Sequence, residues 1–539
     1  MRENELPQSK PDGFASSLGE GASGVPANLA LTPETANPSG ETVVQKRPQA
    51  FLNHKYKNIF PLNMARAQAE VIPNRPAPAL QSFSRNDTIG HRKIPCRRGL
   101  FRRSGHRKKE AVIMSMNTVP ERLAALRAAM AANGVAVYLI PVGDPHASEY
   151  LPCHYTSLTW FSGFHGENSN FVVTRTESAL WADGRYFVQA EKEIAGTEIK
   201  LQRMGEPGVP TVEEYCANAL NEGEALGLCG LTASTALVND LKKALEKKGA
   251  SIKTLNLEDE LWTEGRPALP DTPAWILPKE YAGFSPAEKL DQLRSKLKEL
   301  GCTAQFVGKL DNLAWLLNLR AMDIECTPYA MAYCYVTPRR AVLFINTARV
   351  TPEAKAELEA NGITLAEYDD VLKFLAAETE PQTVLAECAT VNYAVYQVLE
   401  QNPALTVKDG TDPLLMMKGV KNETELAHTK QAHTRDAVAM VRFQIEMESR
   451  LAAGETLTEL TVDEILHKYR SADDKFLVES FGTIAAYGGN AAMMHYHATP
   501  EDHAKLQRKG RILTMPDTDA ASVVAEALHF PQHGRPCFS

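Results

Sequence analysis

One order of structural signals occurs twice in this chain of 539 residues, and it strongly limits the folds that the chain can adopt. Each copy has a helical pattern, an apolar run typical of a buried strand, a tryptophan segment, a β-hairpin and a further helix. The first copy begins near Val119 and the second near Ser285. Because both copies mix helices with continuous apolar strands, the repeat predicts two similar α/β domains.

The first copy opens with apolar residues at helical spacing. Leu123, Leu126 and Met130 share one face, and the run 135–140 reads as a buried strand. Segments 171–174 and 179–181 form the expected hairpin.

The second copy begins with a capping box, in which Ser285 and Glu288 flank a proline at the first helical position. The run 303–307 is the matching strand, and 332–336 with 341–345 form the matching hairpin. We therefore expect α/β domains at 116–280 and 281–418.

Composition places the chain among ordinary globular proteins, with 44% apolar and 23% charged residues. A net charge of −8 gives no general attraction to nucleic acid or to acidic membranes. The nine cysteines are scattered and include no CxxC pair, which indicates reduced thiols in a cytoplasmic protein. We therefore expect neither a nucleic-acid partner nor a membrane partner.

The first 115 residues lack helical or strand periodicity and carry a dense basic block at 91–110. The block allows a nuclear-type signal, a nucleic-acid arm or a transit segment. We favour another explanation, that residues 1–115 are a disordered, non-native extension produced by translation from a start upstream of Met114 and Met116.

A third domain is expected from residue 419. Asn422 and Glu425 form the cap of a long helix that runs to about Leu451. The apolar stripe on this helix, formed by Ala427, Val438, Val441 and Ile445, is expected to pack on a large surface. Thr461 and Glu464 are expected to cap a short helix that ends near Tyr469, and 476–486 is expected to be a strand.

Several polar residues in this chain have both a structural and a functional explanation. His428 and His433 are five residues apart, so one helix cannot direct both at one metal, and structural roles are favoured. The turn at 183–185 is expected to be an ordinary surface turn. After the first strand, Asp144, His146, Ser148 and Glu149 form either a pocket or an ordinary loop.

The segment 481–497 (FGTIAAYGGNAAMMHYH) breaks at two glycines and then presents His495 and His497. Together with VYLIPVGDPHASEYL, LWADGRYF, LDNLAWLLNLRAMDI and VKNETELAHTKQAHTRDAVAMVRF, it resembles the aminopeptidase P (X-Pro aminopeptidase) family of the creatinase/pita-bread superfamily. The resemblance runs from about 119 to 510. It implies two creatinase-N-like α/β domains, followed by an α+β pita-bread domain.

In activity, the resemblance implies metal-dependent hydrolysis of the bond before proline in X-Pro peptides. It implies two divalent metals of the manganese type, which lower the pKa of a bridging water and stabilise an oxyanion. It also implies that His495 is the catalytic histidine that contacts substrate and assists proton transfer. A homodimer is a further implication.

The resemblance is lost after Gly510, where the family has a metal-binding aspartate. Asp517 and Asp519 lack the glycine-rich and threonine-rich context of that motif, and Pro531 lies between His529 and His533, which disfavours one helix presenting both. We assign no metal ligand and expect a partial pita-bread domain at 419–512, with an aberrant tail at 513–539 from a frameshift or a truncated reading frame. The chain as written is then expected to bind no metal and to be inactive. A non-catalytic peptide-binding or dimerisation module is the alternative.

Overall fold

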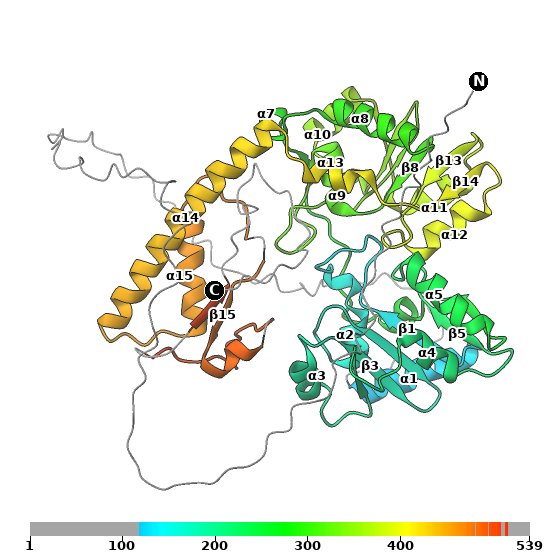
Figure 1. The fold of residues 1–539 in the computed structure, drawn as a ribbon, viewed down its shortest axis with the longest axis horizontal. Coiled ribbons are helices and arrows are strands. Elements are labelled where there is room, and N and C mark those ends of the chain that lie inside the picture. The colour runs from blue at the N-terminus through cyan, green and yellow to red at the C-terminus, as the bar shows by residue number, and fades with distance from the viewer. Residues whose placement is uncertain (1–117, 480, 494, 508–511, 516–539) are drawn as a thin grey trace, which may run out of the picture. The chain divides into compact units, whose positions relative to one another are not determined.

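A computed structural model describes residues 118–479, 481–493, 495–507 and 512–515 of the chain (Figure 1). The extension at 1–115, the tail from 516 and the pairs Asp517/Asp519 and His529/His533 lie outside the described residues.

The first α/β domain is built around a sheet of six strands in the order β4-β3-β2-β1-β5-β6. Its strands are β1 (Val137–Pro141), β2 (Asn170–Thr174), β3 (Ser178–Ala182), β4 (Lys200–Arg203), β5 (Ala225–Leu228) and β6 (Ser251–Thr254). Its helices are α1 (Val119–Ala132), α2 (Ser157–Ser162), α3 (Phe187–Glu193), α4 (Val212–Asn218), α5 (Thr235–Glu246) and α6 (Leu257–Leu261). β1 pairs with β2 in an antiparallel ladder and with β5 in a parallel one.

Helices cover both faces of this sheet, which explains why its central strands are apolar throughout. Tyr138 and Ile140 of β1 pack in one core with α1, α2 and α6, whereas Val137 and Leu139 pack in the opposite core with α4 and α5. Successive strand residues point to opposite faces, so a strand buried on both sides needs an unbroken apolar run. The run at 135–140 is that signal.

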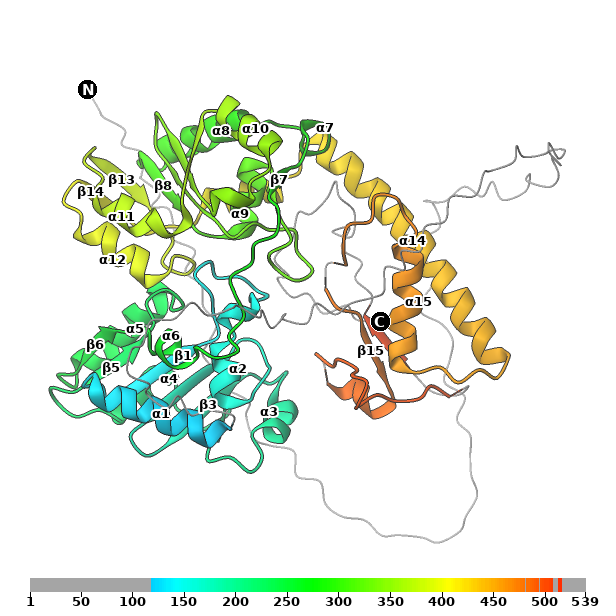
Figure 2. The same cartoon turned by 180° about the vertical axis from the view of Figure 1, so that it is seen from behind.

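The second α/β domain repeats the first. Its sheet has the order β12-β11-β10-β8-β13-β14, in which each strand occupies the place of its counterpart. Its strands are β8 (Ala304–Val307), β10 (Tyr333–Val336), β11 (Ala341–Phe344), β12 (Ile363–Ala366), β13 (Gln382–Leu385) and β14 (Leu405–Lys408), with a small pair β7 (Trp275–Ile276) and β9 (Leu319–Arg320). Its helices are α7 (Lys279–Ala282), α8 (Pro286–Glu299), α9 (Leu310–Leu317), α10 (Pro352–Ala360), α11 (Val371–Ala376), α12 (Tyr393–Gln401) and α13 (Pro413–Gly419). The predicted α/β duplication is confirmed, and Figure 2 shows both sheets with their helices.

The two α/β domains form hydrogen bonds with each other through the first turns of equivalent helices. The Thr235 N–H at the start of α5 donates to Val391 O at 3.0 Å, and the Tyr393 N–H at the start of α12 donates to Ala233 O at 2.9 Å. First-turn N–H groups have no partner within their own helix, so each domain satisfies donors of the other. Ser234 also forms a β-bridge with Asn392.

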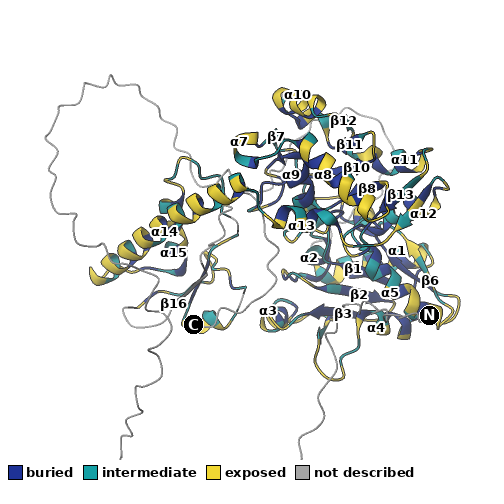
Figure 3. Ribbon diagram, turned by 45° about the horizontal axis from the view of Figure 1, so that its top comes forward, coloured by how far each residue is buried: buried dark blue, intermediate teal, exposed yellow. Residues whose placement is uncertain are grey.

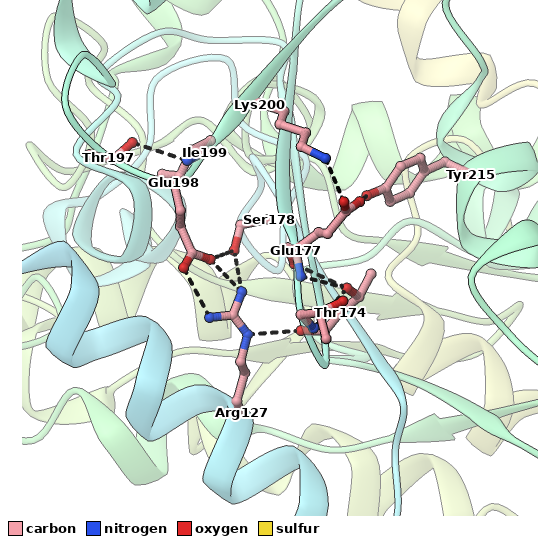
Figure 4. Close-up of polar contacts among 10 residues, drawn as sticks. Arg127, Thr174, Glu177, Ser178, Thr197, Glu198, Ile199, Lys200 and Tyr215 are labelled. Atoms are coloured by element: carbon pink, nitrogen blue, oxygen red, sulfur yellow. Dashed lines mark hydrogen bonds and ion pairs between the residues drawn. The ribbon is translucent and has the colours of Figure 1, made fainter.

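Arg127 fixes α1 to the edge of the first sheet (Figure 4). Its guanidinium donates to the backbone oxygen of Thr174 at 3.0 Å and to Ser178 Oγ at 3.0 Å, and it pairs with the Glu198 carboxylate. These groups come from the end of β2, the start of β3 and the segment just before β4, so one side chain joins the helix to this side of the sheet.

The C-terminal region contains α14 (Glu423–Ala452), α15 (Glu459–Arg470), a strand β15 (Ile484–Tyr487), a 3-10 turn at Gly488–Ala492 and β16 (Ile512–Met515), which pairs antiparallel with β15. Two of these elements differ from expectation. Thr458, rather than Thr461, is the N-cap of α15, because Thr458 Oγ1 accepts from the Thr461 N–H. The strand predicted at 476–486 is limited to Ile484–Tyr487.

The expectation for the buried face of α14 was wrong. Val438, Val441 and Ile445 are 47%, 58% and 62% exposed, and the residues that pack against α15 include Phe443 and Met447 (Figure 3). Both faces of this helix carry apolar residues, so their spacing alone did not identify the buried one.

Candidate functional site

His495 lies beside a charged turn of the first α/β domain. Its Nε2 is 3.3 Å from Arg185 Nη1, and its ring centroid is 5.2 Å from that of Tyr186. The Arg185 guanidinium therefore donates toward Nε2, which places the ring proton on Nδ1. A half-buried histidine whose Nδ1 carries the ring proton thus lies next to a cation.

Asp183 holds Arg185 in this position. Its carboxylate accepts from Arg185 Nε at 3.0 Å and from Arg185 Nη2 at 2.6 Å, and it also accepts from the Asn168 side chain at 2.9 Å. This bidentate arrangement orients the guanidinium more tightly than a single contact would. The expectation of an ordinary surface turn at 183–185 was therefore incomplete, because the turn also contacts the predicted catalytic histidine.

Burial and charge keep His495 neutral. Burial is the largest cause that lowers its pKa, and the positive charge of Arg185 acts in the same direction, whereas Glu167 and Asp183 raise the pKa. A neutral imidazole can donate one hydrogen bond and accept another, which suits proton transfer near neutral pH.

A buried carboxylate, Glu459, fixes the segment that carries His495. It is 0% exposed and accepts hydrogen bonds from the backbone N–H groups of Tyr487 and Ala504, each at 2.6 Å. It also accepts from Tyr496 Oη at 2.8 Å and from the Asn490 amide at 3.1 Å. Burial raises the pKa of Glu459, but the hydrogen bonds together lower it by more. The pKa therefore lies below its usual value, and the carboxylate stays ionised. Sequence reasoning missed this residue because its partners follow it by 28 to 45 positions.

Most of the other sequence candidates lie away from this cluster. His428 contacts Glu280 O at 3.3 Å and the Tyr281 ring, which fits a structural role. His146 is fully buried between the α/β domains, where Nδ1 contacts Gly308 O at 2.8 Å and Nε2 contacts Tyr368 Oη at 2.8 Å.

The loop after β1 lines small cavities, in agreement with the first of its two explanations, a pocket. A cavity of about 130 Å³ is lined in part by His146, Ser148 and Glu149, and one of about 270 Å³ is lined in part by Asp144. Both lie where the two α/β domains meet, away from His495.

The described residues do not fit a two-metal centre. Within 118–479, 481–493, 495–507 and 512–515, no group of three or more His, Cys, Asp or Glu side chains converges. His495 Nε2 already contacts the Arg185 guanidinium, and Glu459 already accepts from four groups. Within the same ranges, no helix is both long enough and apolar enough to cross a membrane.

Family models match three consecutive parts of the chain. Models of the creatinase/prolidase N-terminal domain match residues 122–261 and 265–425, and a model of metallopeptidase family M24 matches 427–515.

The chain is also similar to individual X-Pro aminopeptidases. It is 34% identical to probable Xaa-Pro aminopeptidase P of Sordaria macrospora, over 78% of this chain and 70% of that protein. It is 32% identical to aminopeptidase P2 of Arabidopsis thaliana, over 77% of this chain and 63% of that protein. A crystal structure of an X-prolyl aminopeptidase from Caenorhabditis elegans, described as a cytosolic enzyme with a di-nuclear active site, aligns with a TM-score of 0.68 and 31% identity, over 72% of this chain and 66% of that chain.

The chain thus spans about two thirds of the length of these relatives. The order of domains in the family models agrees with the duplicated α/β fold and the C-terminal region of the structure. The chain belongs to the aminopeptidase P family of Xaa-Pro aminopeptidases, in the creatinase/M24 superfamily.

Proposed function

We propose that this protein recognises X-Pro peptides and that His495 and Arg185 form part of the peptide-binding surface. The observation that carries the proposal is the contact between Arg185 Nη1 and His495 Nε2. It places a fixed guanidinium beside an imidazole whose Nδ1 carries the ring proton, on a partly exposed surface. Peptide carbonyl oxygens accept from both kinds of donor.

The electrostatics around His495 suit a peptide. Arg185 offers a positive group for a carbonyl or a carboxylate, while Glu167 lies close enough to His495 to raise its pKa and offers a negative group for an amino terminus. Tyr186 Oη donates to Glu167 Oε2 at 3.1 Å, which holds that carboxylate in place. In an active enzyme of this family, His495 would be the residue that contacts the substrate and handles a proton.

We further propose that residues 1–539 alone do not hydrolyse these peptides. The relatives include an enzyme described as di-nuclear, but no group of ligands for one metal converges in the described ranges. A metal centre of that kind would need ligands from outside those ranges. On this proposal the described residues bind the peptide, and cleavage requires metal ligands from outside them.

Binding can be tested with two matched arginine variants. Arg185 and Arg203 have side chains that are both 39% exposed and both paired with a carboxylate, but Arg203 has no contact with His495. We expect Arg185→Ala and His495→Ala to weaken the affinity for a fluorescent X-Pro peptide by roughly tenfold, the value of one charge-assisted hydrogen bond. Arg203→Ala should retain the wild-type affinity. Equal losses in Arg185→Ala and Arg203→Ala would contradict the assignment.

Membership of the family also predicts the location, the metal and the oligomeric state of this protein, and these three stay predictions. A cytosolic location is supported by the description of the C. elegans relative and by the buried free thiols of Cys216, Cys229, Cys302, Cys334 and Cys388. Manganese is the expected metal of a complete centre, and the homodimer can be checked by sedimentation velocity.

A further inference from the structure

A cavity of about 250 Å³ lies where the two α/β domains meet, and it is separate from the His495 cluster. The first domain contributes Tyr155, Glu258 and Leu269 to its lining, and the second contributes Tyr333 and Tyr368. Aromatic and aliphatic walls with a few polar groups are typical of sites for small molecules.

Glu258 places a buried carboxylate in the lining of this cavity. The residue is 3% exposed, and its Oε2 accepts a hydrogen bond from Tyr138 Oη, whereas its Oε1 has no partner. A buried oxygen without a donor is costly, so the site favours a ligand that supplies one.

The charges around the cavity determine which sign of charge a ligand should carry. Among the described residues that line it, Arg266 is the only arginine or lysine, and its Nη1 is already paired with Asp259. Burial lowers the pKa of His154, so this lining residue is neutral. Glu258 and Asp369 then leave the lining with negative charge and no paired cation.

We infer that this cavity binds a small primary alkylammonium ion, with its ammonium group toward the Glu258 carboxylate and its alkyl chain along the tyrosine and leucine side chains. An ammonium group supplies the missing donor, and aromatic rings attract cations as well as apolar chains. Neutral alcohols lack the charge, and anions would meet two carboxylates.

Binding is expected to depend on pH. Burial raises the pKa of Glu258 to about 7, and the neighbouring Asp259 also raises it, whereas hydrogen bonding from Tyr138 and the charge of Arg266 lower it. Cys229 also lies close, and burial keeps its thiol protonated by raising the pKa. An ammonium ion favours the ionised carboxylate, so binding releases a proton, and affinity should rise from about pH 6 to about pH 8.

The test uses butylammonium chloride as the probe, with n-butanol as a neutral ligand of the same shape and sodium chloride as a control for ionic strength. We expect butylammonium alone to give a saturable rise in the thermal unfolding midpoint of the full chain, confirmed by isothermal titration calorimetry. Glu258→Gln keeps an oxygen for the Tyr138 hydroxyl but removes the charge, and it should weaken binding by roughly tenfold or more. Glu260→Gln, on the exposed face of the same short helix, should bind as the wild type does.

Three results would overturn the inference. One is the absence of saturable butylammonium binding in a folded wild-type protein. Another is equal binding by butylammonium and butanol, which would show an apolar cavity without charge selection. The third is unchanged affinity in a folded Glu258→Gln variant, which would place the ammonium elsewhere.

Discussion

Replacement of Glu459 by glutamine should release the segment that carries His495 while the two α/β domains stay intact. Glu459 Oε1 accepts from the Tyr487 N–H, and Oε2 accepts from the Ala504 N–H, each at 2.6 Å. A glutamine amide has one oxygen and one NH₂ group, so either orientation sets a donor against one of these backbone donors. The variant also loses the charge that strengthens the bond from Tyr496 Oη.

The size of the effect follows from the number of bonds affected. A hydrogen bond to a charged group contributes about 1.5–3 kcal/mol, and a buried donor left without an acceptor costs a similar amount. With at least one backbone donor unsatisfied and the other bonds weakened, we expect the C-terminal region to lose about 3–5 kcal/mol of stability. That loss is comparable to the stability of a small structural unit, so the segment should open locally.

Hydrogen–deuterium exchange measured by mass spectrometry can locate this loss. Protection in peptides from 484–506 should fall in Glu459→Gln, while peptides from 119–408 keep wild-type protection. Glu464→Gln is the matched control, because this exposed glutamate lies on the same helix. Equal protection of 484–506 in the two variants would refute the role given to Glu459.

Three further predictions concern stability. Arg127→Met should lower the free energy of unfolding by about 1–2 kcal/mol in urea titrations, because it removes the bonds to Thr174 O and Ser178 Oγ and an ion pair that solvent partly screens; a wild-type value would contradict the role of Arg127. The pKa of Glu258, raised to about 7 in the fold, means that the folded state binds the extra proton, so the contribution of Glu258 to stability should be largest below about pH 4.5 and fall by up to about 3 kcal/mol as the pH rises to about 7; the difference in stability between the wild type and Glu258→Gln should change with pH by this amount, and a difference that is the same at all pH values refutes it. Val441→Lys should change stability by less than about 0.5 kcal/mol, whereas Phe443→Lys should cost roughly 3 kcal/mol; the reverse order would show that the apolar stripe is the buried face.

The α/β duplication could be predicted because its signals are local. The capping box at the start of α8, the proline in its first turn and the apolar runs of β1 and β8 all depend on a few neighbouring residues. Local signals of this kind determine the type of an element, and two copies in the same order identify the architecture.

The arrangement of the site could not be predicted in the same way. Arg185 and His495 are 310 residues apart, and no local pattern indicates that they meet. Sequence alone gave Arg185 an ordinary role, because a charged residue after an Asp-Gly turn is common on surfaces. The resemblance to the family supplied His495, while the residues that orient it emerged only from the fold.

The most direct test of the account combines binding and cleavage in one experiment. A purified chain of residues 1–539 is incubated with a fluorescent X-Pro peptide and manganese, binding is followed by fluorescence anisotropy, and cleavage is followed by mass spectrometry. His495→Ala serves as the control for host aminopeptidases, since any contaminating activity persists in that variant. The account predicts saturable binding that weakens in His495→Ala, with the peptide left uncut by both proteins. Cleavage by the wild type that disappears in His495→Ala, or no binding at all, would contradict it.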